Sequence, residues 1–165
     1  MRTFRRSLTP TFATVPADQP VSAASRVTDL RDLDAAFTIR EKVFVQEQGV
    51  PLDEEYDEHD RTDAAHYLAR AADGTPCGAA RWRPTANGVK LERFAVLPEY
   101  RNQQAGAALL AAVLHDVRAA HPGALVYLHA QVPAIRFYER HSFEKVGEMF
   151  EECDIQHYKM VWKPA

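Results

Sequence analysis

Two hydrophobic periodicities alternate along this chain and divide it into helices and strands. Across residues 33–47 the apolar side chains recur at helical spacing, and Gly49 and Pro51 follow as a stop signal. Asp32 stands at the position expected for the N-cap of this helix. A short strand is predicted before the helix, at residues 25–28.

The acidic segment that follows, residues 52–63, is predicted to be a loop or an irregular helix. Three strand patterns come next, at 65–70, 77–83 and 89–96. The dipeptides Asp73-Gly74 and Asn87-Gly88 separate these strands and are signals for tight hairpin turns. Two such turns in succession predict an antiparallel meander.

The second half of the chain alternates helix and strand patterns. A long Ala/Leu-rich helix at 103–120 precedes a continuous apolar run at 125–130, which is typical of a strand buried on both faces. A short helix at 133–140 and two strands at 143–150 and 155–162 complete the order. The pattern predicts a mixed sheet with one strand-helix-strand crossover.

Composition narrows the class of protein without changing this outline. The chain has 165 residues, which suits one domain, and its 46% hydrophobic and 26% charged residues argue against disorder. The net charge of −3 gives no field that attracts nucleic acid, and no apolar stretch approaches the ~20 residues of a membrane span. Cys77 and Cys153 are too few for a disulfide scaffold, so a cytoplasmic location is the default expectation.

Residues 1–20 differ from the rest of the chain in composition. They carry Arg2, Arg5 and Arg6 among Thr, Pro and Ala, and they lack the continuous apolar run of a secretory signal. We expect a flexible tail here and a single domain at 21–165, with a transit peptide as the alternative interpretation of the tail.

The turn that opens the long helix carries the first candidate chemistry, within the stretch 91–110, LERFAVLPEYRNQQAGAALL. The first amides of a helix have no internal partner and the helix dipole adds about half a positive charge, so this turn can bind a phosphate. Arg101 can add charge-assisted bonds, and Gly106 permits close approach. Taken alone, one glycine at a helix start more often serves close packing than phosphate binding. The stretch is neither a P-loop, because the Gly-Lys-Ser/Thr sequence is missing, nor the dinucleotide-binding fingerprint, which needs three glycines in a fixed pattern.

A second stretch, 129–143, reads HAQVPAIRFYERHSF and directly follows the buried strand. Taken together, the two stretches resemble the acetyl-CoA core of the GNAT superfamily of N-acetyltransferases. The first half of the chain is similar to the ElaA-like branch through Arg40-x-x-Val43-Phe44-Val45-x-Glu47-Gln48-x-Val50-Pro51, Glu55-x-Asp57-x-His59-Asp60 and Ala65-His66-Tyr67-Leu68. The end of the chain fits that branch through Phe150, Asp154-Ile155-x-His157 and Met160.

The resemblance implies an α/β (α+β) GNAT fold, with a mixed, mostly antiparallel sheet of six or seven strands and about four helices on both faces. It implies an acyltransferase that uses acetyl-CoA as cosubstrate and acetylates a primary amine of a small molecule or peptide by direct attack. A coenzyme A-binding regulatory module without turnover is the alternative. No nucleic-acid or membrane partner is expected. A homodimer is one option, by analogy with the family alone.

The same resemblance assigns positions that bind the cofactor. The backbone of 94–96 would pair with the pantetheine arm, and Arg101 with the amides at the helix start would wrap the diphosphate. The full set is Phe94, Ala95, Val96, Arg101, Asn102, Gln103, Gln104, Ala105, Gly106, Ala107, Gln131 and Ala134. Gln104 and Ser142 stand where the family usually has Gly, and Gln131 where Asn is commoner. A left-handed Gln104 would cost of order 1 kcal/mol.

Amine acetylation needs a proton donor for the departing thiolate and a base for the amine. A Tyr with a pKa near ~10 can protonate a thiolate whose thiol has a pKa near ~8.5, and the resemblance gives this role to Tyr138. By spacing alone, Tyr138 is a packed aromatic of a short helix. The candidates for the base are Glu92, His157 and Glu47, each of which is otherwise an ordinary surface or capping residue.

The acidic segment 52–63 has two interpretations. It contains seven carboxylates against one arginine, so it is either a solvated loop or a negative rim that attracts a cationic amine. The second interpretation predicts an acceptor pocket built by Phe44, Glu47, Gln48 and Asp57.

Histidine and cysteine side chains offer two further kinds of chemistry. His59, Asp60 and His66 match no standard zinc spacing, so no metal site is predicted. Cys153, with His157 four residues later, would suit a covalent acyl-enzyme mechanism, but a partly buried structural cysteine is the preferred interpretation.

Overall fold

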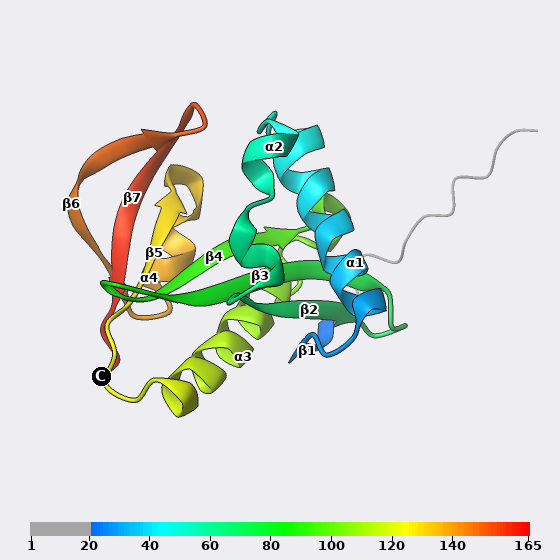
Figure 1. Ribbon diagram of the computed structural model, residues 1–165, viewed down its shortest axis with the longest axis horizontal. Coiled ribbons are helices and arrows are strands. Elements are labelled where there is room, and N and C mark those ends of the chain that lie inside the picture. The colour runs from blue at the N-terminus through cyan, green and yellow to red at the C-terminus, as the bar shows by residue number, and fades with distance from the viewer. Residues whose placement is uncertain (1–20) are drawn as a thin grey trace, which may run out of the picture.

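A computed structural model describes residues 21–165 of the chain as a seven-stranded sheet with helices on both faces (Figure 1). The predicted tail, residues 1–20, lies outside the described residues. The strands are β1 (Val21–Arg26), β2 (Ala65–Ala71), β3 (Pro76–Thr85), β4 (Gly88–Val96), β5 (Val126–Gln131), β6 (Phe143–Glu152) and β7 (Ile155–Trp162). Their order in the sheet is β1-β2-β3-β4-β5-β7-β6, and only β4 and β5 pair in parallel. The predicted mixed, mostly antiparallel sheet is confirmed.

Four α-helices accompany the sheet within residues 21–165. They are α1 (Leu30–Arg40), α2 (Leu52–Glu55), α3 (Ala105–Ala120) and α4 (Ile135–Glu139). In this described part of the chain, no helix combines the length and the apolar character that crossing a membrane requires. The helix α3 joins the parallel strands β4 and β5, which is the predicted strand-helix-strand crossover.

The alternation of side chains along the strands builds one core on each face of the sheet. On β2, Tyr67 and Ala69 pack with Leu109 and the other buried residues of α3, whereas Leu68 packs with Ala36 of α1 on the opposite face. Figure 1 shows α1 and α3 on opposite sides of the strands. We call these two sides the α1 face and the α3 face.

The first helix differs from its prediction at both ends. The N-cap is Asp29, whose side chain accepts a hydrogen bond of 2.8 Å from the amide of Asp32, so Asp32 lies inside the first turn. The predicted regular helix also changes at residue 41 into a π-helix, η1 (Glu41–Glu47), which ends just before Gly49 at φ +75°. Single π-helical turns often occur at functional sites, and this one leads directly into the predicted acceptor residues.

Two other element boundaries move relative to the prediction. The first strand runs over Val21–Arg26 rather than residues 25–28, because it pairs along β2 as an edge strand. Helix α3 begins at Ala105, two residues later than predicted, because Gln104 has left-handed backbone angles (φ 72°, ψ 6°) that cannot continue a helix.

A β-bulge in β4 and the divergence of β5 open the sheet. The register between β3 and β4 shifts by one residue, and Arg93 has a φ of 58° at this point. Strands β4 and β5 are paired only from Val89 with Val126 to Leu91 with Leu128, and beyond these residues they separate. The resulting gap in the sheet leads from one face to the other.

Candidate functional site

A hollow lies on the α3 face where helix α3 begins. Its volume is about 550 Å³, and we call it the α3 hollow. Nine of the twelve predicted cofactor residues line it: Phe94, Val96, Arg101, Asn102, Gln104, Ala105, Gly106, Ala107 and Ala134. Of the other three, Ala95 is buried against α1, Gln103 donates a hydrogen bond to the Glu99 carbonyl, and Gln131 lies on the opposite side of the sheet. The structure therefore gathers most of the predicted set around the start of one helix.

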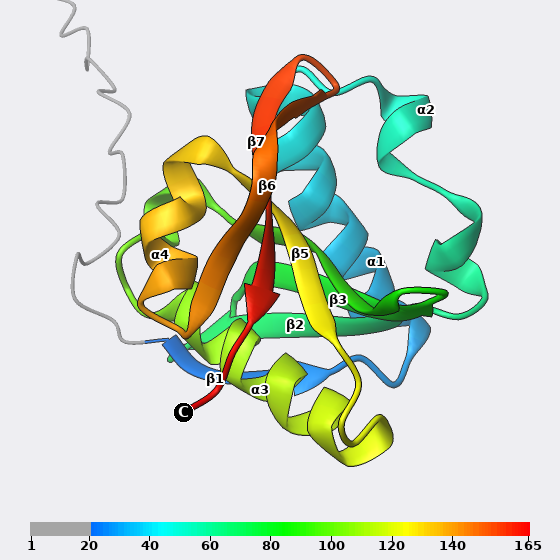
Figure 2. The same cartoon turned by 90° about the vertical axis from the view of Figure 1, so that its left-hand side faces the viewer.

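A second, smaller cavity of about 190 Å³ lies on the α1 face, between the helices and the β6–β7 hairpin. We call it the α2 cavity. Figure 2 shows the hairpin rising toward α1 and α2, so both halves of the chain contribute to its walls. The side chains that bear its chemistry are Gln48, Glu54, Glu55, Lys90, Glu92, Arg93, His129, Gln131, Tyr138, Glu152, Cys153 and His157.

The two spaces meet at the gap between β4 and β5. Phe94, Ala134 and Tyr138 line both of them. Because β4 and β5 stop pairing after Leu91, no backbone hydrogen bonds between these strands separate the two spaces there. This junction is the place where two reactants from opposite faces of the sheet would meet.

Tyr138 stands at the junction with a free hydroxyl. The residue is 7% exposed, and its ring packs edge-on against Phe94 and Phe143. Within residues 21–165 the hydroxyl has no hydrogen-bond partner, and burial raises the pKa of Tyr138 above its usual 10.0. The phenol is therefore protonated at neutral pH and can donate a proton to a reactant.

His157 lies in the α2 cavity with one tautomer favoured by its contacts. Its Nδ1 is 2.7 Å from the carbonyl oxygen of Ile155, and because a carbonyl only accepts, this nitrogen carries the proton. The lone pair of the neutral imidazole is then on Nε2, which makes no hydrogen bond within residues 21–165. The ring is 7% exposed and stacks beside Phe150. This arrangement suits a general base.

A histidine–carboxylate pair in the cavity was missed from the sequence. His129 of β5 and Glu152 of β6 approach to 2.9 Å between Nδ1 and Oε1. The hydrogen bond from His129 lowers the pKa of Glu152, with smaller contributions from the charges of Lys90 and His157. Only the alternation along β5, which puts His129 and Gln131 on one face, could have pointed to His129.

Glu92, another of the three predicted bases, is paired with arginine side chains. Its Oε2 accepts hydrogen bonds from Nε and Nη2 of Arg81, and its Oε1 accepts one of 2.8 Å from Arg83. Burial alone would raise the pKa of Glu92, but the charge and hydrogen bonds of Arg81 outweigh it and lower the pKa. A carboxylate held in this way is a poor proton acceptor, whereas Nε2 of His157 makes no hydrogen bond within residues 21–165.

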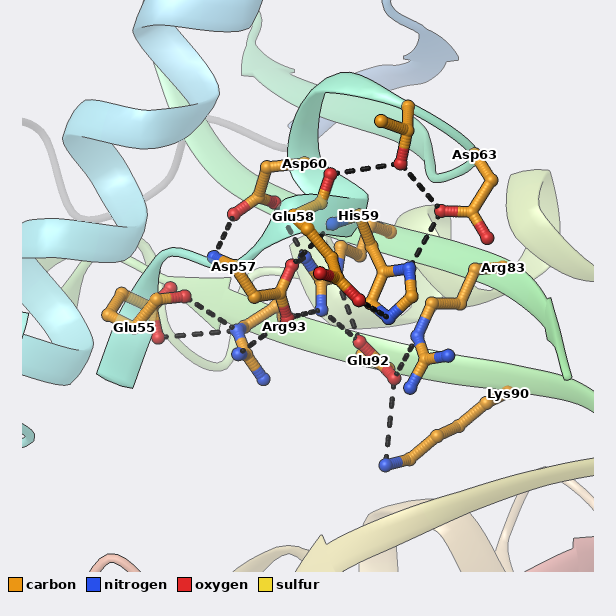
Figure 3. A network of polar contacts seen from close by, with 12 residues as sticks. Glu55, Asp57, Glu58, His59, Asp60, Asp63, Arg83, Lys90, Glu92 and Arg93 are labelled. Carbon is orange, nitrogen blue, oxygen red and sulfur yellow. Dashed lines mark hydrogen bonds and ion pairs between the residues drawn. The ribbon is translucent and has the colours of Figure 1, made fainter. Parts of the chain in front are cut away.

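Three of the seven carboxylates in the acidic segment 52–63, those of Glu55, Asp57 and Asp60, bind buried arginines, whereas Asp53, Glu54, Glu58 and Asp63 are exposed. Figure 3 shows Glu55 and Asp57 also joined to Arg93. Asp57 makes two hydrogen bonds, of 2.7 and 2.6 Å, to Arg81, whose side chain is fully buried. Burial acts to raise the pKa of Asp57, but the hydrogen bonds from Arg81 dominate and lower it. Asp57 does not line the α2 cavity, so the structure separates it from the predicted acceptor residues Phe44 and Gln48.

A second buried arginine, Arg40 of α1, completes this network. It binds Glu55 at 2.7 Å and Asp60 at 2.6 Å, and Asp60 also binds Arg81 at 2.6 Å. The carboxylates near His66 are thus paired with guanidinium groups. No group of three His, Cys, Asp or Glu side chains suited to a metal ion occurs among residues 21–165.

Glu47, the third predicted base, pairs with the predicted diphosphate ligand. The two carboxylate oxygens of Glu47 accept hydrogen bonds of 2.6 and 2.7 Å from Arg101, and this pairing lowers the pKa of Glu47. Arg101 also donates from Nε to the Val96 carbonyl. Glu47 therefore contacts the edge of the α3 hollow rather than the α2 cavity, and a diphosphate would compete with it for Arg101.

Cys153 is poorly suited to nucleophilic attack. Its thiol donates a hydrogen bond of 2.7 Å to Glu54, which raises the pKa of Cys153 to about 11. At neutral pH the thiolate that would attack a thioester is scarce. The contact instead links α2 to the β6–β7 turn across the opening of the α2 cavity.

Both positions where the chain replaces the family's usual glycine have left-handed backbone angles, with φ 72° at Gln104 and φ 68° at Ser142. Replacing Gln104 with Gly is expected to raise the free energy of unfolding by about 1 kcal/mol, because glycine adopts this conformation without steric cost. Urea denaturation measures the change. Gln103→Gly is the matched control, since Gln103 is not in the left-handed region, and it should lower stability. Equal effects of the two substitutions would contradict the explanation.

Comparisons with known proteins agree with this geometry. The family model described as "Acetyltransferase (GNAT) domain" matches residues 28–164. A Bacillus subtilis protein named as the uncharacterized N-acetyltransferase YjcF is 37% identical over 131 residues, which cover 78% of this chain and 91% of that protein. The crystal structure of Escherichia coli ElaA, 28% identical, superposes with a TM-score of 0.75 over 85% of this chain and 97% of ElaA. The crystal structure of an acyl-CoA N-acyltransferase from Pseudomonas aeruginosa is also 28% identical. It superposes with a TM-score of 0.74 over 86% of this chain and 97% of that protein. The chain belongs to the GNAT acetyltransferase family.

Proposed function

We propose that this protein is an acetyl-CoA-dependent N-acetyltransferase that acetylates a primary amine on a small molecule or peptide by direct attack on the thioester. The observation that carries the proposal is the junction at Tyr138, where the α3 hollow and the α2 cavity meet through the gap between β4 and β5. One space suits the cofactor, the other suits the acceptor, and an unpartnered phenol lies between them.

The α3 hollow fits coenzyme A chemically. The amides at the start of α3 have no helical partner, and the left-handed angles of Asn102 and Gln104 shape the turn that presents them. Gly106 leaves room beside the Phe137 ring, since a Cβ at residue 106 would come within 3.3 Å of that ring. The unpaired end of β4 offers backbone groups to an extended amide chain such as pantetheine.

Tyr138 at the junction and His157 in the α2 cavity would divide the proton transfers between them. His157 would accept a proton from the acceptor nitrogen through Nε2, directly or through a water, as the nitrogen forms its bond to the acetyl carbon. The carbon–sulfur bond then breaks, and Tyr138 would donate its proton to the leaving sulfur. The products are the N-acetyl amine and coenzyme A as a free thiol. Tyr138 would regain a proton from solvent, and His157 would lose one.

A second candidate is a coenzyme A-binding module without turnover. The bidentate contact between Glu47 and Arg101 favours it, because the guanidinium that would bind the diphosphate already has an acidic partner. The strained Gln104 at the helix start points in the same direction. Both features would weaken cofactor binding, but neither removes the proton donor at Tyr138.

An assay of thiol release separates the two candidates. The protein is incubated with acetyl-CoA and a panel of primary amines, free thiol is monitored continuously, and the acetylated amine is identified by mass spectrometry. Amine-dependent thiol release with a matching N-acetyl product supports the transferase. Coenzyme A binding by calorimetry, with no thiol release across the panel, supports the binding module and rejects the transferase.

A further inference from the structure

Lys90 is a cation with spare hydrogen-bonding capacity in the wall of the α2 cavity. Its side chain is 20% exposed, and its ammonium makes no hydrogen bond within residues 21–165. The nearest carboxylate oxygen, Oε1 of Glu92, is 3.6 Å away and already accepts a hydrogen bond of 2.8 Å from Arg83. Figure 3 shows Lys90 at the edge of the network, where it is joined to Glu92 alone. The ammonium therefore remains available to an anion in the cavity.

Arg93 adds a second loosely held cation to the same wall. It occupies the β-bulge at a φ of 58°, an unfavourable angle for a residue with a side chain. Its contacts with Glu55 and Asp57 are 3.3 and 3.5 Å long, whereas charge-assisted hydrogen bonds are typically ~2.7–2.9 Å. This side of the cavity thus presents positive charge that the protein's own acids satisfy poorly.

The acids of the cavity differ in how far their own side-chain contacts engage them. Glu152 accepts from His129 at 2.9 Å, and Glu54 accepts from the Cys153 thiol at 2.7 Å. Glu92 is held by Arg81 and Arg83. Glu54 and Glu152 each keep a second carboxylate oxygen without a hydrogen bond within residues 21–165, so the free capacity for an anion lies at Lys90, on the β4 wall of the cavity.

Strand register gives the separation between this anion position and the proposed base. Lys90 is opposite Tyr127, and His157 is opposite Gln131, on the same face of β5. Tyr127 and Gln131 are four residues apart, about 13 Å at ~3.3 Å per residue. An acceptor that contacts both side chains therefore needs several bonds between its amine and its anion.

We propose that the acceptor is a small amine carrying an anionic group, a carboxylate or a phosphate, several bonds from the reactive nitrogen, and that Lys90 binds this anion. The inference rests on the proposed N-acetyltransferase function and specifies its substrate class. The cavity volume of about 190 Å³ lies below the ~300 Å³ at which drug-sized ligand pockets begin, which fits a small acceptor.

Matched acceptors test the proposal. Linear ω-amino acids of three to seven carbons are compared with n-alkylamines of equal chain length, and aminoalkyl phosphates of equal length distinguish phosphate from carboxylate. With the wild-type protein, kcat/KM for the preferred anionic series should exceed that of the matched alkylamines by about 10- to 100-fold, the range expected for a hydrogen bond to a charged group. Lys90→Met should abolish this ratio.

Lys159→Met is the control variant. Lys159 lies on β7 over the Tyr127 ring and does not line the α2 cavity, so the variant should keep the wild-type ratio. Because each ratio compares two substrates on one protein sample, partial misfolding of a variant cancels. Equal kcat/KM for anionic and plain amines in the wild type, or a preference that survives Lys90→Met, overturns the inference and leaves the transferase function intact. Absence of thiol release with every amine rejects the proposed function itself.

Discussion

Replacing Tyr138 with Phe is expected to lower kcat by about 10²- to 10⁴-fold, while the affinity for coenzyme A stays close to that of the wild type. The substitution removes the only proton that the phenol can give to the leaving sulfur and keeps the ring that packs against Phe94 and Phe143. The hydroxyl makes no hydrogen bond within residues 21–165, so its removal leaves no other donor or acceptor without its partner. A stability loss should therefore not obscure the kinetic effect.

Thiol-release kinetics at saturating acetyl-CoA measure the change in kcat, and calorimetry measures coenzyme A binding. Tyr127→Phe is the control, because the hydroxyl of Tyr127 contacts Thr85 on β3 and lies outside both the α3 hollow and the α2 cavity. The control variant should retain wild-type kcat. If Tyr138→Phe also retains it, Tyr138 is a packing residue and the departing thiolate leaves without its help.

The pH dependence of the wild-type enzyme gives a second check on Tyr138. Burial raises the pKa of Tyr138 above 10.0, so the phenol stays protonated and competent as an acid throughout the neutral and mildly alkaline range. With the acceptor amine increasingly neutral as pH rises, kcat/KM should increase up to about pH 9 without a falling limb. A fall with a midpoint near pH 8 would show that a different, less basic group acts as the acid.

The strands and the crossover were predictable because their signals are local. The hairpin turns at Asp73-Gly74 and Asn87-Gly88 separate β2, β3 and β4 as the sequence indicates, and the apolar run at 125–130 is the buried β5. The predicted helix 103–120 included Gln104, although the family usually has Gly at this position; the left-handed angle that Gln104 adopts is the conformation that glycine takes without cost.

The pairing of charged side chains was not predictable, because it depends on contacts between distant segments. The acidic segment 52–63 looks solvent-exposed in the sequence, yet Asp60 binds both Arg40 and Arg81, 20 and 21 residues away. The same limit hid His129 and Glu152, which come from different strands. Periodicity identifies the face on which such a side chain lies, but not its partner across the sheet.

Arg81→Met is expected to lower the free energy of unfolding by about 3–5 kcal/mol, the usual cost of removing one member of a buried ion-pair network. Arg81 is 0% exposed and bonds to Asp57 and Asp60 of the acidic segment and to Glu92 of β4, so its loss removes a counter-charge from three carboxylates, of which Asp60 and Glu92 are buried. Urea denaturation at pH 7 measures the effect. Arg83→Met is the matched control, because Arg83 is 20% exposed and contacts only one oxygen of Glu92, and it should cost about 1 kcal/mol or less.

Acidification should reduce the difference in the free energy of unfolding between the wild type and Arg81→Met. Arg81 contributes to lowering the folded-state pKa values of Asp57, Asp60 and Glu92 below their ordinary 3.8 and 4.5. A carboxylate with a lowered pKa contributes stability above its unfolded-state pKa, and this contribution is lost as pH falls through the folded-state pKa. In Arg81→Met the carboxylates titrate at higher pH and lose their buried charge on protonation, so the gap in unfolding free energy should narrow between pH 5 and pH 3. A gap that is unchanged over this range would mean that Arg81 stabilises the fold by packing rather than by charge.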